Sequence, residues 1–207
     1  VGVLISVVIA FLVGLPTLRL KGDYLAIATL GVAEIIRVAV TNMKITNGAA
    51  GISGVPLTNT WTITYIALVL TTILILNYTF SSAGRATYAV LQDEIAAESM
   101  GVQVTKYKIL AFVLGAATAS IGGTLSATTL GAVTPSDFTF MKSIDVLIIV
   151  VFGGIGSFTG SFVAAVLLGI INLVLQPFGQ LRMIIYAIAL ILIMIFRPGG
   201  LLGTWEF

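Results

Sequence analysis

The charged side chains inside apolar runs are the residues of this sequence whose types and spacing could do chemistry. Glu34 and Arg37 lie three residues apart in the run 24–41, so on a helix they share one face and can form an ion pair. Charges inside a membrane are costly, and such pairs either mark substrate paths or link helices internally. The spacing leaves both roles open for Glu34 and Arg37.

Catalytic and metal sites have little support in this composition. Asp145, with Asp137 or Glu34, forms a set of carboxylates that could share a proton in an intramembrane enzyme. Asp137, however, lies in a polar connection two residues after Pro135, which disfavours that alternative. The chain has no Cys and no His, and it lacks the G-x-x-x-x-G-K-[ST] phosphate-binding loop. We therefore predict no catalytic residue, no metal site and no cofactor bound by this chain.

Composition places the chain in the membrane class. It is 58% hydrophobic and 9% charged, whereas soluble domains are about 25% charged. The mean hydropathy is +1.15, and too few polar side chains remain to cover a soluble core. The ten Lys and Arg residues are scattered at the ends of apolar runs, so we expect a lipid bilayer and no nucleic acid as partner.

The apolar runs predict an all-α, polytopic bundle of membrane helices with about seven spans. Each run is long enough, at about 1.5 Å per residue, to cross most of a bilayer. The sequence starts at Val1 inside an apolar run, so we expect further spans upstream. The predicted spans are residues 1–18, 24–41, 61–80, 109–130, 143–160, 161–175 and 181–196.

Glycines interrupt this pattern at two places. Residues 44–56 contain three glycines and a proline, which predicts a loop or a re-entrant segment. A Gly-Gly pair breaks the run 143–160, either as backbone that lines a transport path or, the preferred interpretation, as a tight turn between two short helices. The glycines considered for a substrate path are Gly48, Gly51, Gly54, Gly153 and Gly154.

Small residues recur at every fourth position in the run 109–130. Gly115, Ala119, Gly123 and Ala127 therefore line one face of a helix, which predicts a close contact with a neighbouring helix. We expect this helix to lie centrally in the bundle.

Residues 85–108 form the one long stretch that could not sit in lipid, because they hold six of the eighteen charged side chains. Asp93 can cap a short helix that runs to Met100, with Gly101 in the left-handed conformation after it. A two-turn helix is unstable alone in water, so it must pack on the spans beside it or on a partner. The small side chains of Ala96 and Ala97 would let a partner surface come close.

Basic residues give this stretch a side of the membrane. If residues 85–108 are cytoplasmic and the spans alternate, six basic residues fall inside and three outside, as the positive-inside rule requires. Those inside are Arg19, Lys21, Arg85, Lys106, Lys108 and Arg197, and those outside are Lys44, Lys142 and Arg182.

Several motifs resemble one known family, in the order in which that family has them. They are LRLKGDYLAIATLGVAEIIR at 18–37, TNGAAGISGVP at 46–56, DEIAAESMG at 93–101, FTFMKSI at 138–144, VVFGGIGSFTG at 150–160 and FRPGGLL at 196–202. Together they resemble the permease subunits of bacterial branched-chain amino-acid ABC transporters, in particular the larger of the two paired permeases.

The resemblance implies half of a heterodimeric pore in the bacterial cytoplasmic membrane, with a second permease, two ATPase subunits that carry ATP and Mg, and an external substrate-binding protein. It implies one permease domain over 1–207 with a coupling segment at 84–107. Branched-chain amino acids are the expected substrate, with urea, short amides or sugars as alternatives because Asp145 stands where an apolar residue is expected. The coupling residues that it implies are Asp93, Glu94, Ala96, Ala97, Met100 and Gly101.

Overall fold

The computed structural model describes residues 1–175 apart from 21, 59 and 155, together with 185 and 188. Contacts between residues divide the chain into two compact units, unit 1 (Val1–Asp137) and unit 2 (Phe138–Phe207), and each is described by itself. The single permease domain predicted over 1–207 stays a prediction.

Unit 1 is built from six α-helices, as predicted for an all-α chain. Their bounds are α1 (Gly2–Thr17), α2 (Asp23–Asn42), α3 (Trp61–Phe80), α4 (Ser82–Gln92), α5 (Glu94–Ser99) and α6 (Val104–Leu130). Four of them correspond to the predicted spans 1–18, 24–41, 61–80 and 109–130. The last helix starts at Val104 instead of residue 109, so its first turns carry the predicted connection's basic residues.

Three of these helices, α2, α3 and α6, are long and apolar enough to cross a membrane. Large apolar side chains such as Leu12, Ile27 and Leu70 are exposed on them and on α1. A helix satisfies its backbone hydrogen bonds internally, so such exposed apolar faces are stable in lipid but not in water. The described part of the chain therefore has the make-up of a helical membrane protein.

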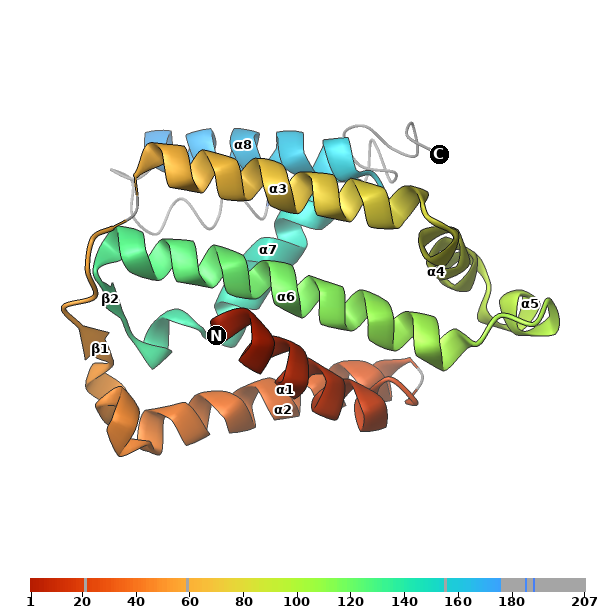
Figure 1. Cartoon of the computed structure of the whole chain (residues 1–207), viewed down its shortest axis with the longest axis horizontal. Helices are drawn as coiled ribbons and strands as arrows, with labels where there is room; N and C mark the ends of the chain where they lie inside the picture. Colours follow the sequence, from red (N-terminus) through yellow and green to blue (C-terminus); the bar gives the residue numbers. More distant parts are fainter. Residues whose placement is uncertain (21, 59, 155, 176–184, 186–187, 189–207) are drawn as a thin grey trace. The chain divides into compact units, whose positions relative to one another are not determined.

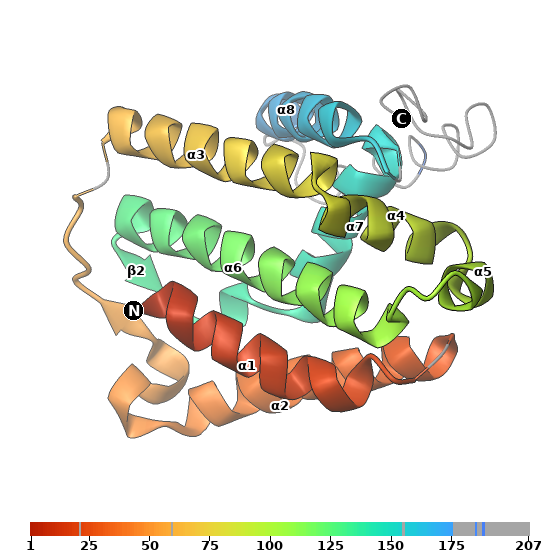
Figure 2. The ribbon, with the colours of Figure 1, turned by 45° about the vertical axis from the view of Figure 1, so that its right-hand side comes forward.

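The connections of unit 1 gather at its two ends. Figures 1 and 2 show α4 and α5 at one end and the short strands β1 (Ile52–Ser53) and β2 (Ala132–Val133) at the opposite end. The strands pair antiparallel, with Ile52 opposite Val133. Polar and irregular backbone thus lies where the membrane surfaces would be.

Residues 44–56 contain no α-helix, as predicted. They form two 3₁₀ turns, η1 (Lys44–Thr46) and η2 (Gly48–Ala50), followed by β1. Gly51 has a φ of +71°, and a Cβ atom there would lie 2.2 Å from the carbonyl oxygen of Val133. Only glycine permits this backbone conformation together with so close an approach to β2. A third 3₁₀ turn, η3 (Pro135–Asp137), ends the unit.

Helix α1 lies along α6 through small and hydroxyl side chains. The Ser6 hydroxyl donates a hydrogen bond of 2.9 Å to the carbonyl oxygen of Ala116. Gly14 sits against the Phe112 ring, and Gly2 lies beside Ser120. The absence of bulk at these positions lets the two helices approach closely.

The face of α6 that holds α1 is not the face predicted for close packing. The predicted face carries Gly115 and Gly123, and a Cβ atom at either position would meet nothing within 4 Å. Within unit 1 the contact runs instead through Phe112 and Ala116, one position round the helix. Packing through Gly115, Ala119, Gly123 and Ala127 therefore stays a prediction about a neighbour outside this unit.

A tight corner joins α3 to α4. The Ser81 hydroxyl oxygen accepts the backbone N–H of Gly84 at 3.1 Å and so caps α4. The Tyr78 and Thr87 hydroxyl groups, one on each helix, are hydrogen-bonded at 2.6 Å. Gly84 itself is buried, and a Cβ atom there would lie 2.2 Å from the carbonyl oxygen of Tyr78. The corner therefore has room for glycine alone.

Unit 2 contains α7 (Phe140–Gly153) and α8 (Phe158–Leu175), whose contact buries Phe152, Ala164 and Leu168. The span predicted over 143–160 ends early, because α7 stops at Gly153. With 14 residues, α7 covers about 21 Å, less than the hydrocarbon core of about 30 Å. The last predicted span, 181–196, lies outside the described residues.

The Gly-Gly break is a tight turn between these two helices, which agrees with the preferred interpretation. Gly154 has a φ of +113° at the end of α7, and the Ser157 hydroxyl oxygen accepts the N–H of Gly160 at 3.0 Å. A Cβ atom on Gly160 would lie 2.2 Å from the carbonyl oxygen of Gly153. These glycines let the helices meet, which explains their presence without a transport path.

We predict that Gly84→Ala destabilises the chain by about 1 to 3 kcal/mol, because the added methyl group must displace backbone carbonyl groups at the α3–α4 corner. Thermal unfolding of the protein purified in detergent measures the effect. Gly31→Ala is the matched control, since Gly31 also lies in a helix but has open space around it. Equal stability of the two variants would contradict this account of the corner.

Candidate functional site

Helix α5 begins at a side-chain cap, as predicted from the sequence. A carboxylate oxygen of Asp93 accepts the backbone N–H groups of Ile95 and Ala96 at 2.8 and 3.1 Å. These N–H groups have no partner within the helix, so the cap replaces water that would otherwise be needed. Asp93 thereby fixes where this six-residue helix starts.

The end of α5 is closed by glycine in the left-handed conformation, again as predicted. Gly101 has a φ of +84°, and its N–H donates to the carbonyl oxygen of Glu98 at 3.0 Å. The N–H of Val102 donates to the carbonyl oxygen of Ala97, also at 3.0 Å. This pair of bonds forms a Schellman motif, which turns the chain back toward α6. A helix too short to be stable alone is thus held at both ends.

One side of α5 faces its own unit. Ala97 is only 5% exposed, and the Glu94 carboxylate forms an ion pair with the ammonium group of Lys108 on α6. The sequence predicted that Ala97 would leave room for a partner, but the structure buries it against unit 1. The chain turns back at Gly101, and the N–H of Val102 is bonded to the carbonyl oxygen of Ala97. This side of the helix therefore lies next to the rest of unit 1.

The other side of α5 carries exposed apolar side chains. Ile95 is 78% exposed and Met100 is 84% exposed, and Ala96 lies beside them at the surface. Leu91, at the end of α4, adds a further exposed side chain. We name Ile95, Ala96 and Met100 the outer face of α5. Large apolar side chains at a polar end of a protein are typical of a contact with another protein.

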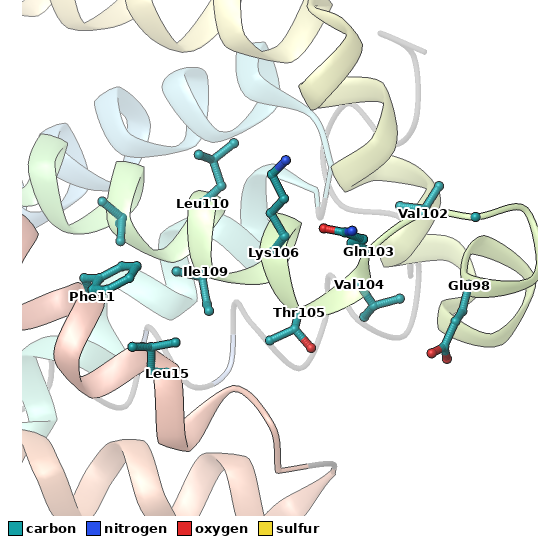
Figure 3. Close-up of a pocket in the computed structure, with 12 residues that line it drawn as sticks. Phe11, Leu15, Glu98, Val102, Gln103, Val104, Thr105, Lys106, Ile109 and Leu110 are labelled. Carbon is teal, nitrogen blue, oxygen red and sulfur yellow. The ribbon is translucent and has the colours of Figure 1, made fainter.

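A pocket of about 840 Å³ lies beside α5, between α1 and the start of α6. Figure 3 shows Phe11 and Leu15 of α1 close to Ile109 of α6, with Lys106 and Glu98 farther along the pocket. Its wall is thus apolar toward the helices and polar toward α5. This pocket could not be predicted from the sequence, because its walls come from segments about 90 residues apart.

The predicted ion pair within α2 is confirmed. The guanidinium group of Arg37 donates two hydrogen bonds to the Glu34 carboxylate, one of them, from Nε, at 2.9 Å. A pair with this two-fold geometry is stronger than a single contact between charges. The Arg37 side chain is 31% exposed and that of Glu34 is 55% exposed, so the pair lies on the surface of unit 1, where lipid or another chain would meet it.

The other acids considered for catalysis each have a different partner. Asp137 accepts hydrogen bonds from the backbone N–H and the hydroxyl group of Thr134, at 3.1 and 2.7 Å, and so shapes a turn. Asp145 lies 3.9 Å from Lys142, one turn earlier on α7, and is well exposed. Among the described residues no group of three or more acidic, Cys or His side chains could hold a metal ion. The carboxylate-enzyme alternative gains no support from these contacts.

The unit 1 residues predicted for a substrate path line neither the pocket beside α5 nor a second pocket of this unit. A pocket of about 420 Å³ lies between α1, α2 and α6 and is lined by apolar residues such as Ile9, Val32 and Phe112. Glu34 and Arg37 lie elsewhere on α2 and are not among its lining residues. Gly48 packs against the C-terminal end of α2. A Cβ atom added to Gly48 would lie 3.2 Å from the carbonyl oxygen of Thr41.

Of the remaining path candidates, Gly51 is explained by its approach to β2, and Gly54 has a φ of +79° in open space. Gly153 and Gly154 belong to unit 2, where they form the turn after α7. The path assignment therefore stays a prediction for all of these residues.

Comparison with known proteins gives one consistent family. The family described as branched-chain amino acid transport system / permease component matches residues 1–196. The high-affinity branched-chain amino acid transport system permease protein LivM of Salmonella typhimurium is 37% identical, over 96% of this chain and 55% of that protein. LivM of Escherichia coli is 36% identical over the same shares. No solved structure matches this chain.

A second type of permease matches less well. The permease protein LivH of Escherichia coli is 30% identical over 70% of this chain and 47% of that protein. The aligned 234 residues form 55% of LivM, whereas 148 residues form 47% of LivH, so LivM is the longer of the two. The expected likeness to the larger permease is confirmed. The chain spans about half the length of these relatives.

We expect Glu34→Gln and Arg37→Met each to lower stability more than the double variant does, because each single change leaves one charge without its partner in a poorly solvating environment. Thermal unfolding of the wild type, the two single variants and the double variant, in detergent or lipid, measures the coupling energy between the two side chains. The exposed pair Lys142 and Asp145 provides the control, with a coupling near zero. Additive effects at Glu34 and Arg37 would argue against a working ion pair.

Proposed function

Because this chain belongs to the family of permease components of branched-chain amino acid transport systems, we propose that it is a membrane subunit of an ATP-driven importer of branched-chain amino acids. It is a transport subunit and not an enzyme, and ATP and Mg are bound by partner ATPase chains. The membrane is the bacterial cytoplasmic membrane, which the chain crosses several times. The names of its relatives and its apolar exposed helices support this proposal.

The outer face of α5 is the observation that carries the proposal. It offers Ile95 and Met100 at the end of unit 1 where polar connections gather, on a helix whose start and end are both fixed. A rigid helix with exposed apolar anchors suits docking into a groove of another protein. We propose that an ATPase subunit provides this groove and moves α5 when it binds and hydrolyses ATP.

The predicted coupling residues divide into three roles in this proposal. Asp93 and Gly101 shape α5, while Glu94 and Ala97 hold it against unit 1. Ala96 and Met100, together with Ile95, meet the ATPase. The assignment differs from the sequence prediction in moving Ala97 to the inner side and adding Ile95 to the contact.

The distribution of charge supports a cytoplasmic position for α5. Arg19, Arg85, Lys106 and Lys108 lie toward its end of unit 1, whereas Lys44 lies at the end with β1 and β2. Connections rich in Lys and Arg stay on the cytoplasmic side during insertion. The β1 and β2 end then faces outward, where an external substrate-binding protein would deliver the amino acid.

A second permease, two ATPase subunits and a binding protein complete the proposed assembly. Similarity to both LivM and LivH proteins supports a pair of related permeases, which together form the pore. The large exposed apolar surfaces of α2 and α3 are available to such a partner as well as to lipid. The Gly115 and Gly123 face of α6, which α1 leaves open, suits close helix contact with it.

The pocket between α1, α2 and α6 supports an apolar substrate. Its lining includes Ile9, Val32 and Phe112, and its hydroxyl groups on Ser6 and Thr29 are already bonded to backbone carbonyl groups. The aliphatic side chain of a branched-chain amino acid would fit this apolar lining, while its ammonium and carboxylate groups would need polar partners outside the pocket. The choice of branched-chain amino acids over urea, short amides or sugars is supported by the names of the relatives.

Uptake by the complete transporter tests the substrate. Proteoliposomes with both permeases, the ATPases and the binding protein should accumulate leucine, isoleucine or valine when supplied with ATP and should not accumulate urea or glucose. Uptake of a polar solute in place of these amino acids would refute the proposed substrate class.

Substitutions on the outer face test the coupling role. Loaded binding protein should stimulate ATP hydrolysis in the wild-type complex. Ile95→Asp and Met100→Asp should each lower this stimulated rate about tenfold, because interface anchors commonly contribute about 1 to 2 kcal/mol. Tyr24→Asp is the control, since Tyr24 is 75% exposed at the same end of unit 1 but lies on α2. Full stimulation of the Ile95 and Met100 variants, in complexes that assemble normally, would refute docking through this face.

A further inference from the structure

Two physical links join α5 to α6. The first is the chain itself, which runs through Gly101, Val102 and Gln103 into α6. The second is the ion pair between Glu94, the first residue of α5, and Lys108, in the second turn of α6. The two links hold opposite ends of the short helix.

The ion pair fixes an end of α5 that the chain alone would leave attached only to α4. Asp93 connects the two helices through a single extended residue, with φ of −155° and ψ of 113°. Without the pair, α5 could pivot about Gly101 while its first turn followed α4. With it, the start of α5 is bound to α6 as well, so α5 has two points of attachment to that helix.

The surroundings of the pair strengthen it. The Lys108 side chain is 20% exposed and the Glu94 side chain is 40% exposed. Both line a pocket of about 850 Å³ whose other walls include Val90, Leu91 and Phe112. The Lys108 side chain lies largely beneath neighbouring side chains, so salt screens its attraction to Glu94 less than it screens two charges in open solvent.

Helix α6 is the element best placed to carry a displacement across the membrane. It has 27 residues, about 40 Å in length, and it packs along α1 and contributes to the walls of all three pockets of unit 1 named above. A shift at its first turns would therefore alter the pocket between α1, α2 and α6. Lys108 lies in those first turns.

We propose that the Glu94–Lys108 ion pair makes α5 and α6 move as one body, so that a push by the partner on the outer face of α5 is transmitted to α6. Glu94 and Lys108 are positioning residues, since neither needs to touch the ATPase or the transported molecule. The proposal rests on the proposed function of α5 as the docking helix and adds the route by which its movement reaches the pore.

The number of amino-acid molecules transported per ATP hydrolysed is the measurement that tests this link. In the complete reconstituted transporter, Glu94→Gln and Lys108→Met should each lower that ratio by about threefold or more while the complex still assembles and hydrolyses ATP. The charge exchange, Glu94→Lys with Lys108→Glu, should restore most of it. Glu98→Gln and Lys106→Met are matched controls on the same two helices, beside the other pocket, and should leave the ratio unchanged.

Two outcomes would overturn the proposal. One is an unchanged ratio in both single variants when the wild-type complex transports normally, which would leave the proposed function intact. The other is a loss of the transport-to-ATP ratio that is as large in the charge-swapped double variant as in the single variants. The attraction between the two charges would then not be the cause of the coupling.

Hydrogen exchange at the α5 amides tests the link without any transport. In the full chain, each single variant should raise the rate of hydrogen exchange at the amides of Ile95 to Ser99. The double variant with swapped charges should lower this rate again, because the ion pair holds α5 in place. Unchanged exchange in both single variants would overturn the link. If the wild-type complex failed to carry branched-chain amino acids, the proposed function would fall while this measurement still decided the role of the pair.

Discussion

The hydrogen bonding of the backbone constrains every element of this chain, because lipid offers no water to a free N–H or C=O group. The long helices satisfy these groups internally and can expose side chains such as Leu12 and Leu70 to lipid. In the described residues of unit 1, irregular backbone lies at the two ends, where the strands pair and the turns are closed by glycine and hydroxyl groups. Those ends are where this part of the chain can meet a water-soluble partner.

Helix α5 shows how a very short element can still be rigid at such an end. Its first N–H groups are bound by Asp93, its last carbonyl groups by the turn at Gly101, and its inner side by Ala97 and the Glu94–Lys108 pair. The apolar side chains of the outer face remain exposed. Rigidity and an exposed apolar contact together are what a docking element requires, because little conformational entropy is then lost on binding.

Several glycines among the described residues allow close packing of the backbone. Gly84 and Gly160 each bring two backbone segments closer than any side chain would permit, and Gly51 does the same where β1 meets β2. These close approaches set the angles at which helices follow one another. The sequence had assigned two such glycines, Gly51 and Gly153, to a substrate path, and both have a sufficient structural reason for being glycine.

The sequence by itself determined the four long apolar helices of unit 1, α1, α2, α3 and α6, because the length and apolar character of a membrane helix are local properties. It also determined the ion pair of Glu34 with Arg37 and both ends of α5, since these depend on residues within about four positions of one another. The sequence also predicted, as the preferred interpretation, the turn after α7, and the structure adds the close approach of Gly153 to Gly160 across that turn.

Tertiary structure alone decided the contacts between distant residues. It placed Ala97 inward, paired Glu94 with Lys108 and seated α1 on the Phe112 and Ala116 face of α6 in place of the Gly115 and Gly123 face. A helix with apolar residues all round has no intrinsic inner side. Which face it buries is therefore set by the neighbour that reaches it, and that is not a property of the helix's own residues.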